Sequence, residues 1–346
     1  MQMEFEDQLN ALIYFHLEEH TSGRHLLQVL EEDDFARAEV ASEAGIKKSS
    51  FFEAINSRGI EQMMEVFQAL QANATKILPR EFANLGDLVA IDGSLIDAVL
   101  SMYWADYREG SKKAKTHIGF DINRGIPMKI FLTDGKGDER PFVSRILSPG
   151  QTGVMDRYYQ CHKNFDLWQT EGKDFVCRIR GNTTKSIIRI TPVKPESIVF
   201  YDAIVLLGTK GVNQTDKELR VVGYRVDNKE YWVATDRYDL SAEDVAMVYK
   251  LRWNIEIFFG WWKRHLKVYH LIARSKHGLM VQILAGLITY LLLAIYCHEQ
   301  HNEKVNINRV RELRIKIKNE AGMQENRPPD HECYKKPNED GLYAKT

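Results

Sequence analysis

The segment from Tyr249 to Lys263 repeats apolar and polar residues with the period of an α-helix. Successive helical residues are rotated by about 100°, which places Tyr249, Arg252, Glu256 and Lys263 within a sector of roughly 60°. The sequence therefore predicts a helix with one buried face and one face that carries a carboxylate between cations. An ordinary surface helix with an Arg–Glu pair at i and i+4 would show the same pattern. The apolar face is predicted to comprise Val248, Leu251, Ile255, Phe258, Phe259 and Trp262.

The polar residues of this helix have the spacing Tyr, two residues, Arg, three residues, Glu, six residues, Lys. In this spacing the chain resembles the DDE transposases of the insertion-sequence-four family, which carry it as their signature. The resemblance implies that Glu256 is the last acid of a metal-binding triad. It also implies that Tyr249, Arg252 and Lys263 contact phosphates of the transposon end.

Two aspartates supply the other acids of the triad that the resemblance implies. Asp92 ends the apolar run 88–92 in an Ile-Asp-Gly-Ser context, and Asp156 ends the run 152–156 in a Met-Asp-Arg context. Both runs are predicted to be strands. Ligand groups gather at the strand ends of an open α/β sheet, so the two aspartates are candidates for a site. Each acid taken alone could instead be a turn or capping residue. Tyr158 stands where the family usually has glycine, which leaves the local turn open.

The expected cofactor is Mg²⁺ or Mn²⁺, as two ions held by Asp92, Asp156 and Glu256. Magnesium binds oxygen ligands, and a pair of divalent ions can activate an attacking oxygen while stabilising a leaving one. The acids of the loop that follows residue 133, Asp134 and Asp138, are expected to be solvated.

Further residues are candidates for DNA contact. Arg157 follows Asp156 directly, and Lys115-Thr-His117 resembles the family's Lys-x-His segment. The basic run that contains Lys115 and His117 could equally be a solvated loop. Some relatives stack an aromatic residue on an extruded base at the position of Trp232. A half-buried tryptophan of a β-sheet is the alternative for that residue.

The order of predicted elements indicates a mixed α/β protein. Residues 1–84 form a helical N-terminal region, in which Phe35–Phe52 has a helix-turn-helix pattern that suits either DNA recognition or a scaffold. Residues 85–180 and 243–300 form the two parts of a core that the resemblance identifies as ribonuclease H-like. Residues 181–242 form an all-β insertion between them. Residues 301–346 contain a basic helix and a polar tail.

The composition is that of a globular protein with a formal net charge of −1, so any DNA-binding surface must be a local one. The four cysteines have no CxxC spacing and are expected to be reduced thiols of a cytoplasmic, nucleoid-associated protein. Residues 279–297 are almost wholly apolar and about long enough to span a membrane. We expect them to form a buried helix, and we expect no membrane partner.

The resemblance implies a DDE transposase that binds terminal inverted repeats, cuts the element ends and joins their 3′-OH groups to target DNA. The expected partners are these DNA segments and a second copy of the chain in a synaptic homodimer. Two alternatives are another metal-dependent nuclease on the same fold and a domesticated, non-catalytic DNA-binding protein.

Overall fold

The computed structural model describes residues 3–41, 45–267 and 270–325. The described part of residues 1–84 is helical, as expected. It contains α1 (Phe5–Leu17), α2 (Gly23–Glu32), α3 (Asp34–Glu39), α4 (Lys48–Ser57), α5 (Ile60–Ile77) and the short 3-10 helix η1 (Ala83–Leu85). Helices α3 and α4 lie at the two ends of the predicted helix-turn-helix, of which residues 42–44 are outside the described residues.

The described residues that follow form ten strands in a single mixed sheet. The strands are β1 (Asp87–Ala98), β2 (Asp106–Arg108), β3 (Ser111–Asp121), β4 (Ile126–Asp134), β5 (Gln151–Met155), β6 (Asp174–Ile179), β7 (Lys185–Ile190), β8 (Val199–Leu207), β9 (Leu219–Val226) and β10 (Lys229–Thr235). Their order is β2-β3-β1-β5-β6-β10-β9-β8-β7, and β4 also pairs with β3. Strand β5 is parallel to β1 and β6, whereas the other pairs are antiparallel.

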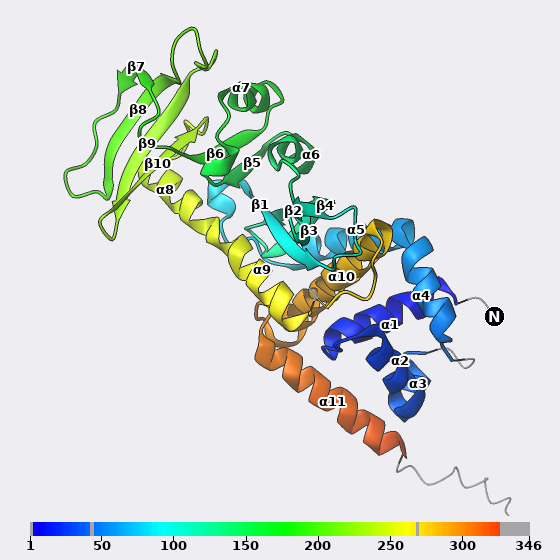
Figure 1. Ribbon diagram of the computed structural model, residues 1–346. Coiled ribbons are helices and arrows are strands. Elements are labelled where there is room, and N and C mark those ends of the chain that lie inside the picture. The colour runs from blue at the N-terminus through cyan, green and yellow to red at the C-terminus, as the bar shows by residue number, and fades with distance from the viewer. Residues whose placement is uncertain (1–2, 42–44, 268–269, 326–346) are drawn as a thin grey trace, which may run out of the picture.

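Helices cover both faces of this sheet (Figure 1). One face packs against α6 (Val143–Ile146) and α7 (His162–Thr170), and its core includes Val89, Ile91 and Met155. The other face packs against α8 (Ala242–Leu251) and α9 (Trp253–His265), and its core includes Leu88, Ala90 and Val154. Because side chains alternate along a strand, even-numbered residues at the start of β1 face α9 and odd-numbered residues face α6.

The long helix α10 (Lys276–His301) lies at the centre of the remaining core. It packs against α1, α4 and α5, so the N-terminal helices and the C-terminal part of the chain share one hydrophobic cluster. It is the one helix of the described residues that is long and apolar enough to cross a membrane, and 83% of its most apolar window is buried inside the protein. That burial is the packing of a core helix, as predicted for residues 279–297. After it comes α11 (Ile307–Glu325).

Three features differ from the sequence-based expectations. Residues 249–263 are not one helix, because α8 ends at Leu251 and α9 begins at Trp253. Strands β7 to β10 continue the main sheet through the β10–β6 pairing, although an insertion between two parts of a core was expected. The sequence of residues 139–147 predicts a helix, but these residues form only the 3-10 turn η2 (Arg140–Phe142) and the single turn α6. Residues 326–346, expected to be a polar tail, lie outside the described residues.

Candidate active site

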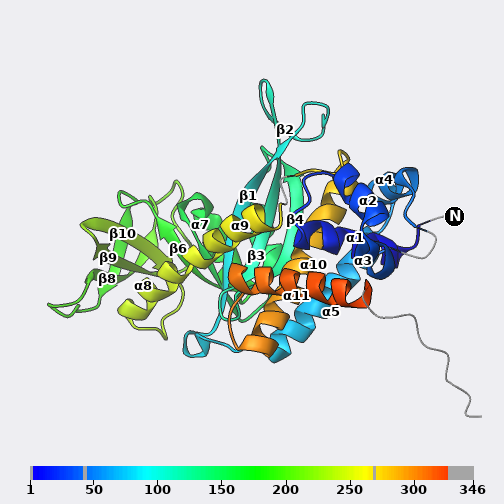
Figure 2. The same ribbon diagram turned by 90° about the horizontal axis from the view of Figure 1, so that it is seen from below.

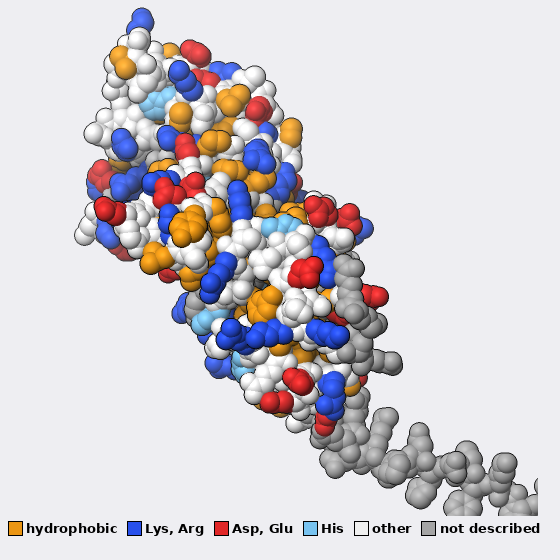
Figure 3. Space-filling model, turned by 45° about the vertical axis from the view of Figure 1, so that its right-hand side comes forward, with side chains coloured by type: hydrophobic (Ala, Val, Ile, Leu, Met, Phe, Trp, Pro, Cys, Tyr) orange, Lys and Arg blue, Asp and Glu red, His pale blue; other side chains and the backbone are white. Residues whose placement is uncertain are grey.

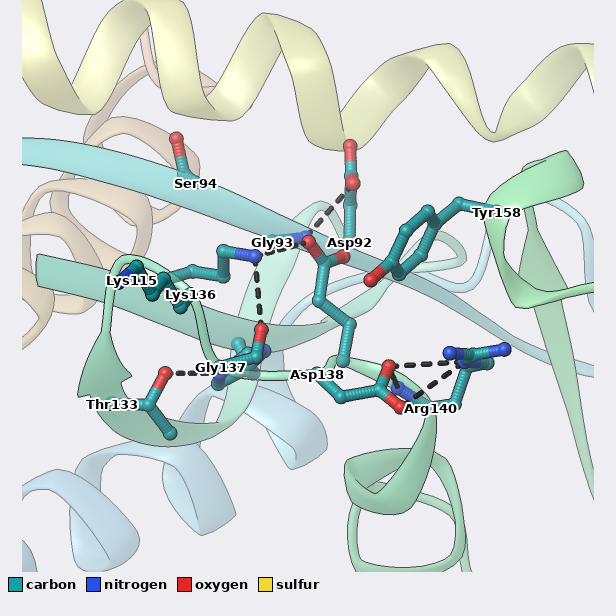
Figure 4. A network of polar contacts seen from close by, with 12 residues as sticks. Asp92, Gly93, Ser94, Lys115, Thr133, Lys136, Gly137, Asp138, Arg140 and Tyr158 are labelled. Atoms are coloured by element: carbon teal, nitrogen blue, oxygen red, sulfur yellow. Dashed lines mark hydrogen bonds and ion pairs between the residues drawn. The ribbon is translucent and has the colours of Figure 1, made fainter. Parts of the chain in front are cut away.

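Asp92 lies in the interior of β1, and not at its end as the sequence suggested. Strand β1 continues to Ala98 because it pairs with β3 over its whole second half. Its parallel pairing with β5, however, ends at Ala90↔Val154. Asp92 therefore sits where β1 loses its neighbour on the β5 side. Its side chain points toward α9 (Figure 4), which is the face that its even position predicts.

Asp156 directly follows the last residue of β5, as predicted. Asp92 and Asp156 each lie two residues beyond the last pair that joins β1 to β5, so they are neighbours across the end of β5. The side chain of Asp156 accepts a 2.9 Å hydrogen bond from the backbone N–H of Tyr158 and caps the 3-10 turn η3 (Arg157–Tyr159). Tyr158 thus occupies the usual glycine position without disturbing this turn.

Helix α9 brings the third acid over the same face of the sheet. At Arg252 the backbone hydrogen bonds join residues three apart. The Arg252 N–H donates to the Tyr249 carbonyl, and the Arg252 carbonyl accepts from the Ile255 N–H. The guanidinium of Arg252 donates a 2.7 Å hydrogen bond to Oε1 of Glu256 and lies 3.8 Å from Oδ2 of Asp92. The Arg252 side chain is only 14% exposed. One internal cation therefore links two of the predicted acids.

The electrostatic setting of Asp92 fits a site that receives a cation. Burial, with smaller contributions from the nearby carboxylates of Glu139 and Asp156, raises the pKa of Asp92 to about 7. The Gly93 N–H and Arg252 oppose this shift in the pKa. When a carboxylate lies near other carboxylates, an added cation stabilises its charged form. A divalent ion here would therefore favour the ionised form of Asp92.

Glu139 is an acid of this region that the sequence did not single out. It follows the Gly-Lys-Gly-Asp turn after β4, and its side chain is 14% exposed. Oε2 of Glu139 accepts a 2.8 Å hydrogen bond from the hydroxyl of the buried Tyr159, and Oε1 lies 3.2 Å from Nζ of Lys115. The neighbouring Asp138 instead pairs with Arg140 at the surface, as expected for a solvated loop acid.

Lys115 and His117 lie on the α6 face of the sheet. Besides its contact with Glu139, Lys115 donates a 2.9 Å hydrogen bond to the Gly137 carbonyl (Figure 4), so it ties β3 to the loop that carries Glu139. The ring of His117 is 1% exposed, stacks on Phe142 at 4.1 Å and pairs with the hydroxyl of Thr133. Neither residue is part of a solvated loop. A phosphate contact by His117 would require its ring to leave this pocket.

The other predicted contact residues have different degrees of exposure. Tyr249 was expected on the polar face of a helix but is 7% exposed, and its ring packs beside Tyr231. Lys263 is partly buried, and its Nζ donates a 2.7 Å hydrogen bond to the Leu95 carbonyl of β1. Arg157 is exposed. Trp232 is half-buried in β10, and the ammonium of Lys185 lies 4.4 Å from the ring centroid.

A basic hollow adjoins Asp156. It is lined by Asp156, Arg157, Tyr158, Arg180, Gly181 and Asn182. The edge of the Trp232 ring lies against Gly181, on the border of this hollow. On the face of the molecule shown in Figure 3, Lys and Arg side chains are interspersed with Asp and Glu. The cations of the hollow that could meet a polyanion near the acids are Arg157 and Arg180.

The acids are close to one another but do not form a preassembled cage. Within the described residues, no group of three or more Asp, Glu, His or Cys side chains is arranged to hold a metal ion. The donor set nevertheless fits a hard divalent cation, because it consists of carboxylate oxygens on one side of the sheet. Arg252 would have to yield part of its contact with Glu256 for that carboxylate to bind a metal ion.

These features define a mixed α/β protein with an acidic centre over the end of β5, and known proteins show which family it belongs to. Residues 84–292, more than half of the chain, match the transposase DDE domain. The chain therefore belongs to this family.

Individual relatives are similar over part of their length. The chain is 27% identical, over 209 residues, to a probable transposase for insertion sequence element IS5377 from Geobacillus stearothermophilus. That match covers 59% of this chain and 55% of the relative. A putative transposase for insertion sequence element IS4SA from Synechocystis sp. is 25% identical over 260 residues, which cover 71% of each protein.

Among solved structures, a piggyBac transposase synaptic complex with hairpin DNA aligns at a TM-score of 0.45 and 13% identity. This alignment covers 96% of this chain and 76% of the other. The matches to the Geobacillus relative and to a putative transposase y4zB from Sinorhizobium fredii span just over half of those two proteins.

Proposed function

We propose that this protein is a DNA transposase that binds the terminal inverted repeats of its own element, cuts the element ends and joins the 3′-OH groups to target DNA. The observation that carries the proposal is the placement of Asp92, Asp156 and Glu256 over the end of β5, in a chain of the transposase DDE domain family. Such a reaction is an in-line transfer at phosphorus and needs no covalent protein intermediate.

In this proposal the three acids hold two divalent ions, Mg²⁺ or Mn²⁺. Bound ions would activate the attacking oxygen and stabilise the leaving one. Asp92 and Asp156 supply oxygens from adjacent strands, and Glu256 supplies them from α9. Arg252 neutralises part of their charge, and its pairing with Glu256 and Asp92 favours a role toward the acids over a role toward DNA.

The DNA contacts are proposed to lie around the basic hollow beside Asp156. Arg157 is exposed there and is free of the internal contacts that hold Arg252, so it is placed to meet a phosphate. Lys263 uses one of its three N–H donors on Leu95, which leaves two for a phosphate. Trp232 is close enough to the hollow for its ring to stack on an extruded base. Tyr249 would act through the aromatic group that it forms with Tyr231.

The finer assignment is a ribonuclease H-like core of the insertion-sequence-four family. The order β4-β3-β1-β5-β6 supports it, with two antiparallel pairs followed by two parallel pairs. The Tyr–Arg–Glu–Lys spacing supports the family assignment. We further propose a cut-and-paste route, a homodimer that holds two ends, and a cytoplasmic location with access to the nucleoid.

The test is cleavage of a labelled DNA fragment that contains the element end. Asp92→Asn, Asp156→Asn and Glu256→Gln should each abolish cleavage and leave DNA binding largely intact, because phosphate contacts come mainly from cations. Asp138→Asn removes the same charge from a surface ion pair and serves as the matched control. Cleavage by Asp156→Asn at the wild-type rate would show that the assignment is wrong.

A further inference from the structure

The carboxylates of Asp92 and Glu139 meet at the same residue, Gly93. The N–H of Gly93 donates a 2.8 Å hydrogen bond to Oδ1 of Asp92. On the other side of the strand, a Cβ added to Gly93 would lie only 2.5–2.7 Å from the carboxylate atoms of Glu139. The missing side chain is therefore the reason that Glu139 can approach β1 so closely.

At Gly93, strand β1 has no paired neighbour on its β5 side. Its pairing with β5 ends at Ala90↔Val154, so groups from the two faces of the sheet can meet around the edge of β1 near Asp92. Tyr159 marks the meeting point. Its hydroxyl bonds Glu139, and burial together with the charges of Glu139, Asp92 and Asp156 raises its pKa well above the usual value. One buried hydroxyl is thus within electrostatic range of all three acids.

The charges around this point do not balance. Asp92, Asp156, Glu139 and Glu256 carry four formal negative charges, and the cations that pair with them are Lys115 and Arg252. Four minus two leaves an excess of two negative charges, which one divalent cation would neutralise. A divalent cation at this point would offset the formal excess and favour the ionised form of the acids.

Glu139 also has free capacity for a ligand. Its two oxygens offer about four acceptor positions. The bonds from Tyr159 and Lys115 use two of them. About two acceptor positions therefore remain for a ligand.

We propose that Glu139 is a fourth acid of the active site and faces the same divalent cation as Asp92 and Asp156. The proposal rests on the proposed function, because it adds a residue to the same acidic centre. The contrasting possibility is that Glu139 only anchors Lys115 and Tyr159 and thereby steadies the loop after β4.

The test measures Mn²⁺ binding to the full chain without DNA, with the free ion followed by its electron paramagnetic resonance signal. Glu139→Gln keeps the shape and one acceptor oxygen but removes the charge. It should weaken Mn²⁺ binding by about tenfold or more, the range typical of residues that support metal ligands. Asp138→Asn, which removes the same charge one residue away, should change the affinity by less than about twofold.

A second variant displaces Glu139 without altering it. The new methyl group of Gly93→Ala would collide with the Glu139 carboxylate, which must move because it is the flexible end of a side chain. Gly93→Ala should therefore also weaken Mn²⁺ binding. In the double variant Gly93→Ala with Glu139→Gln, the effects should not add, because the second change removes what the first one displaces.

The outcomes separate the two proposals. If Glu139→Gln binds Mn²⁺ like the wild type while Asp92→Asn does not, the role of Glu139 is overturned and the proposed function stands. A lower melting temperature with unchanged Mn²⁺ affinity has the same meaning, since it shows a structural role alone. If Asp92→Asn and Asp156→Asn both keep wild-type Mn²⁺ binding, the acidic centre is not a metal site and the proposed function fails.

Discussion

The ammonium of Lys263 donates a 2.7 Å hydrogen bond to the backbone carbonyl of Leu95, and so ties α9 to β1. Leu95 lies three residues after Asp92 on the same strand, and Lys263 lies seven residues, about two turns, after Glu256 on the same helix. The bond therefore fixes the spacing between the two elements that carry these acids. Helix α9 runs beside β1 in both ribbon views (Figures 1 and 2).

Lys263→Met should lower both stability and cleavage. The variant keeps most of the side-chain volume but leaves the Leu95 carbonyl without this donor, at a cost of about 1–2 kcal/mol in the free energy of unfolding. Cleavage should fall more than DNA binding, because α9 and Glu256 lose a fixed position. Urea denaturation and cleavage assays measure the two effects. Lys250→Met, on the exposed side of α8, is the matched control. Wild-type stability and wild-type cleavage would show that the bond to Leu95 does not hold α9 in position.

Arg252→Ala should lower the melting temperature and leave the salt dependence of DNA binding nearly unchanged. The reason is that Arg252 is largely buried and that its guanidinium is held by a hydrogen bond to Glu256 and an ion pair with Asp92. Each lost phosphate contact changes the slope of log affinity against log salt by about one unit. Measuring both quantities on one variant distinguishes the two roles, with Arg157→Ala as the contrasting exposed arginine. A slope reduced by about one unit in Arg252→Ala would place its guanidinium on the DNA backbone.

The stability of the protein should fall as the pH drops below about 6.5, in part through His16. This ring is fully buried between the carbonyls of Leu266 and Gln282. Burial lowers the pKa of His16 from 6.5 to about 4, although the two acceptors favour the protonated ring. Because the unfolded chain then binds a proton more readily than the folded one, the stabilisation is complete above about pH 6.5. It is lost as the pH falls from about 6.5 to about 4, by at most about 3 kcal/mol.

The check is the melting temperature measured across this range for wild type and His16→Gln, which keeps a donor but does not titrate. The variant should show a shallower decline with falling pH. His298→Gln, a partly exposed histidine of α10, should decline like the wild type. Parallel curves for wild type and His16→Gln would contradict the assignment.

The chain should remain in the supernatant when cells are lysed without detergent and centrifuged at high speed. Helix α10 is apolar enough for a membrane, but its side chains are already packed against α1, α4 and α5. A helix that buries its surface in a core gains little from lipid. Recovery of the protein in the membrane pellet after a carbonate wash would contradict this expectation.

The strands and the surroundings of Asp156 were predictable because they depend on local patterns. The apolar run 152–155 marks β5, and the acid after it meets the strand end that the pattern indicates. The position of Asp92 inside β1 could not be predicted in this way, because β1 continues past Asp92 only through pairing with β3. Period and composition cannot report such long-range pairing. The break at Arg252 was also missed, because no glycine or proline marks it.

Glu139 shows the same limit more sharply. Its neighbours Asp138 and Arg140 make it look like one charge of a polar loop. Its importance comes from Gly93 and Tyr159, which are 46 and 20 residues away in the chain. A glycine inside a strand does signal that something approaches the backbone closely. The sequence thus held the signal that space is available at Gly93, but not the identity of the group that fills it.

The β6–β10 pairing has a practical consequence for anyone who shortens this protein. Thr235 and Asp236 bond both backbone groups of Phe175, so β10 closes the edge of the acid-bearing part of the sheet. A version without residues 185–235 would leave β6 as a bare edge, and bare edges recruit other chains and aggregate. Strands that carry none of the proposed acids are therefore the ones that keep a minimal catalytic core from self-association.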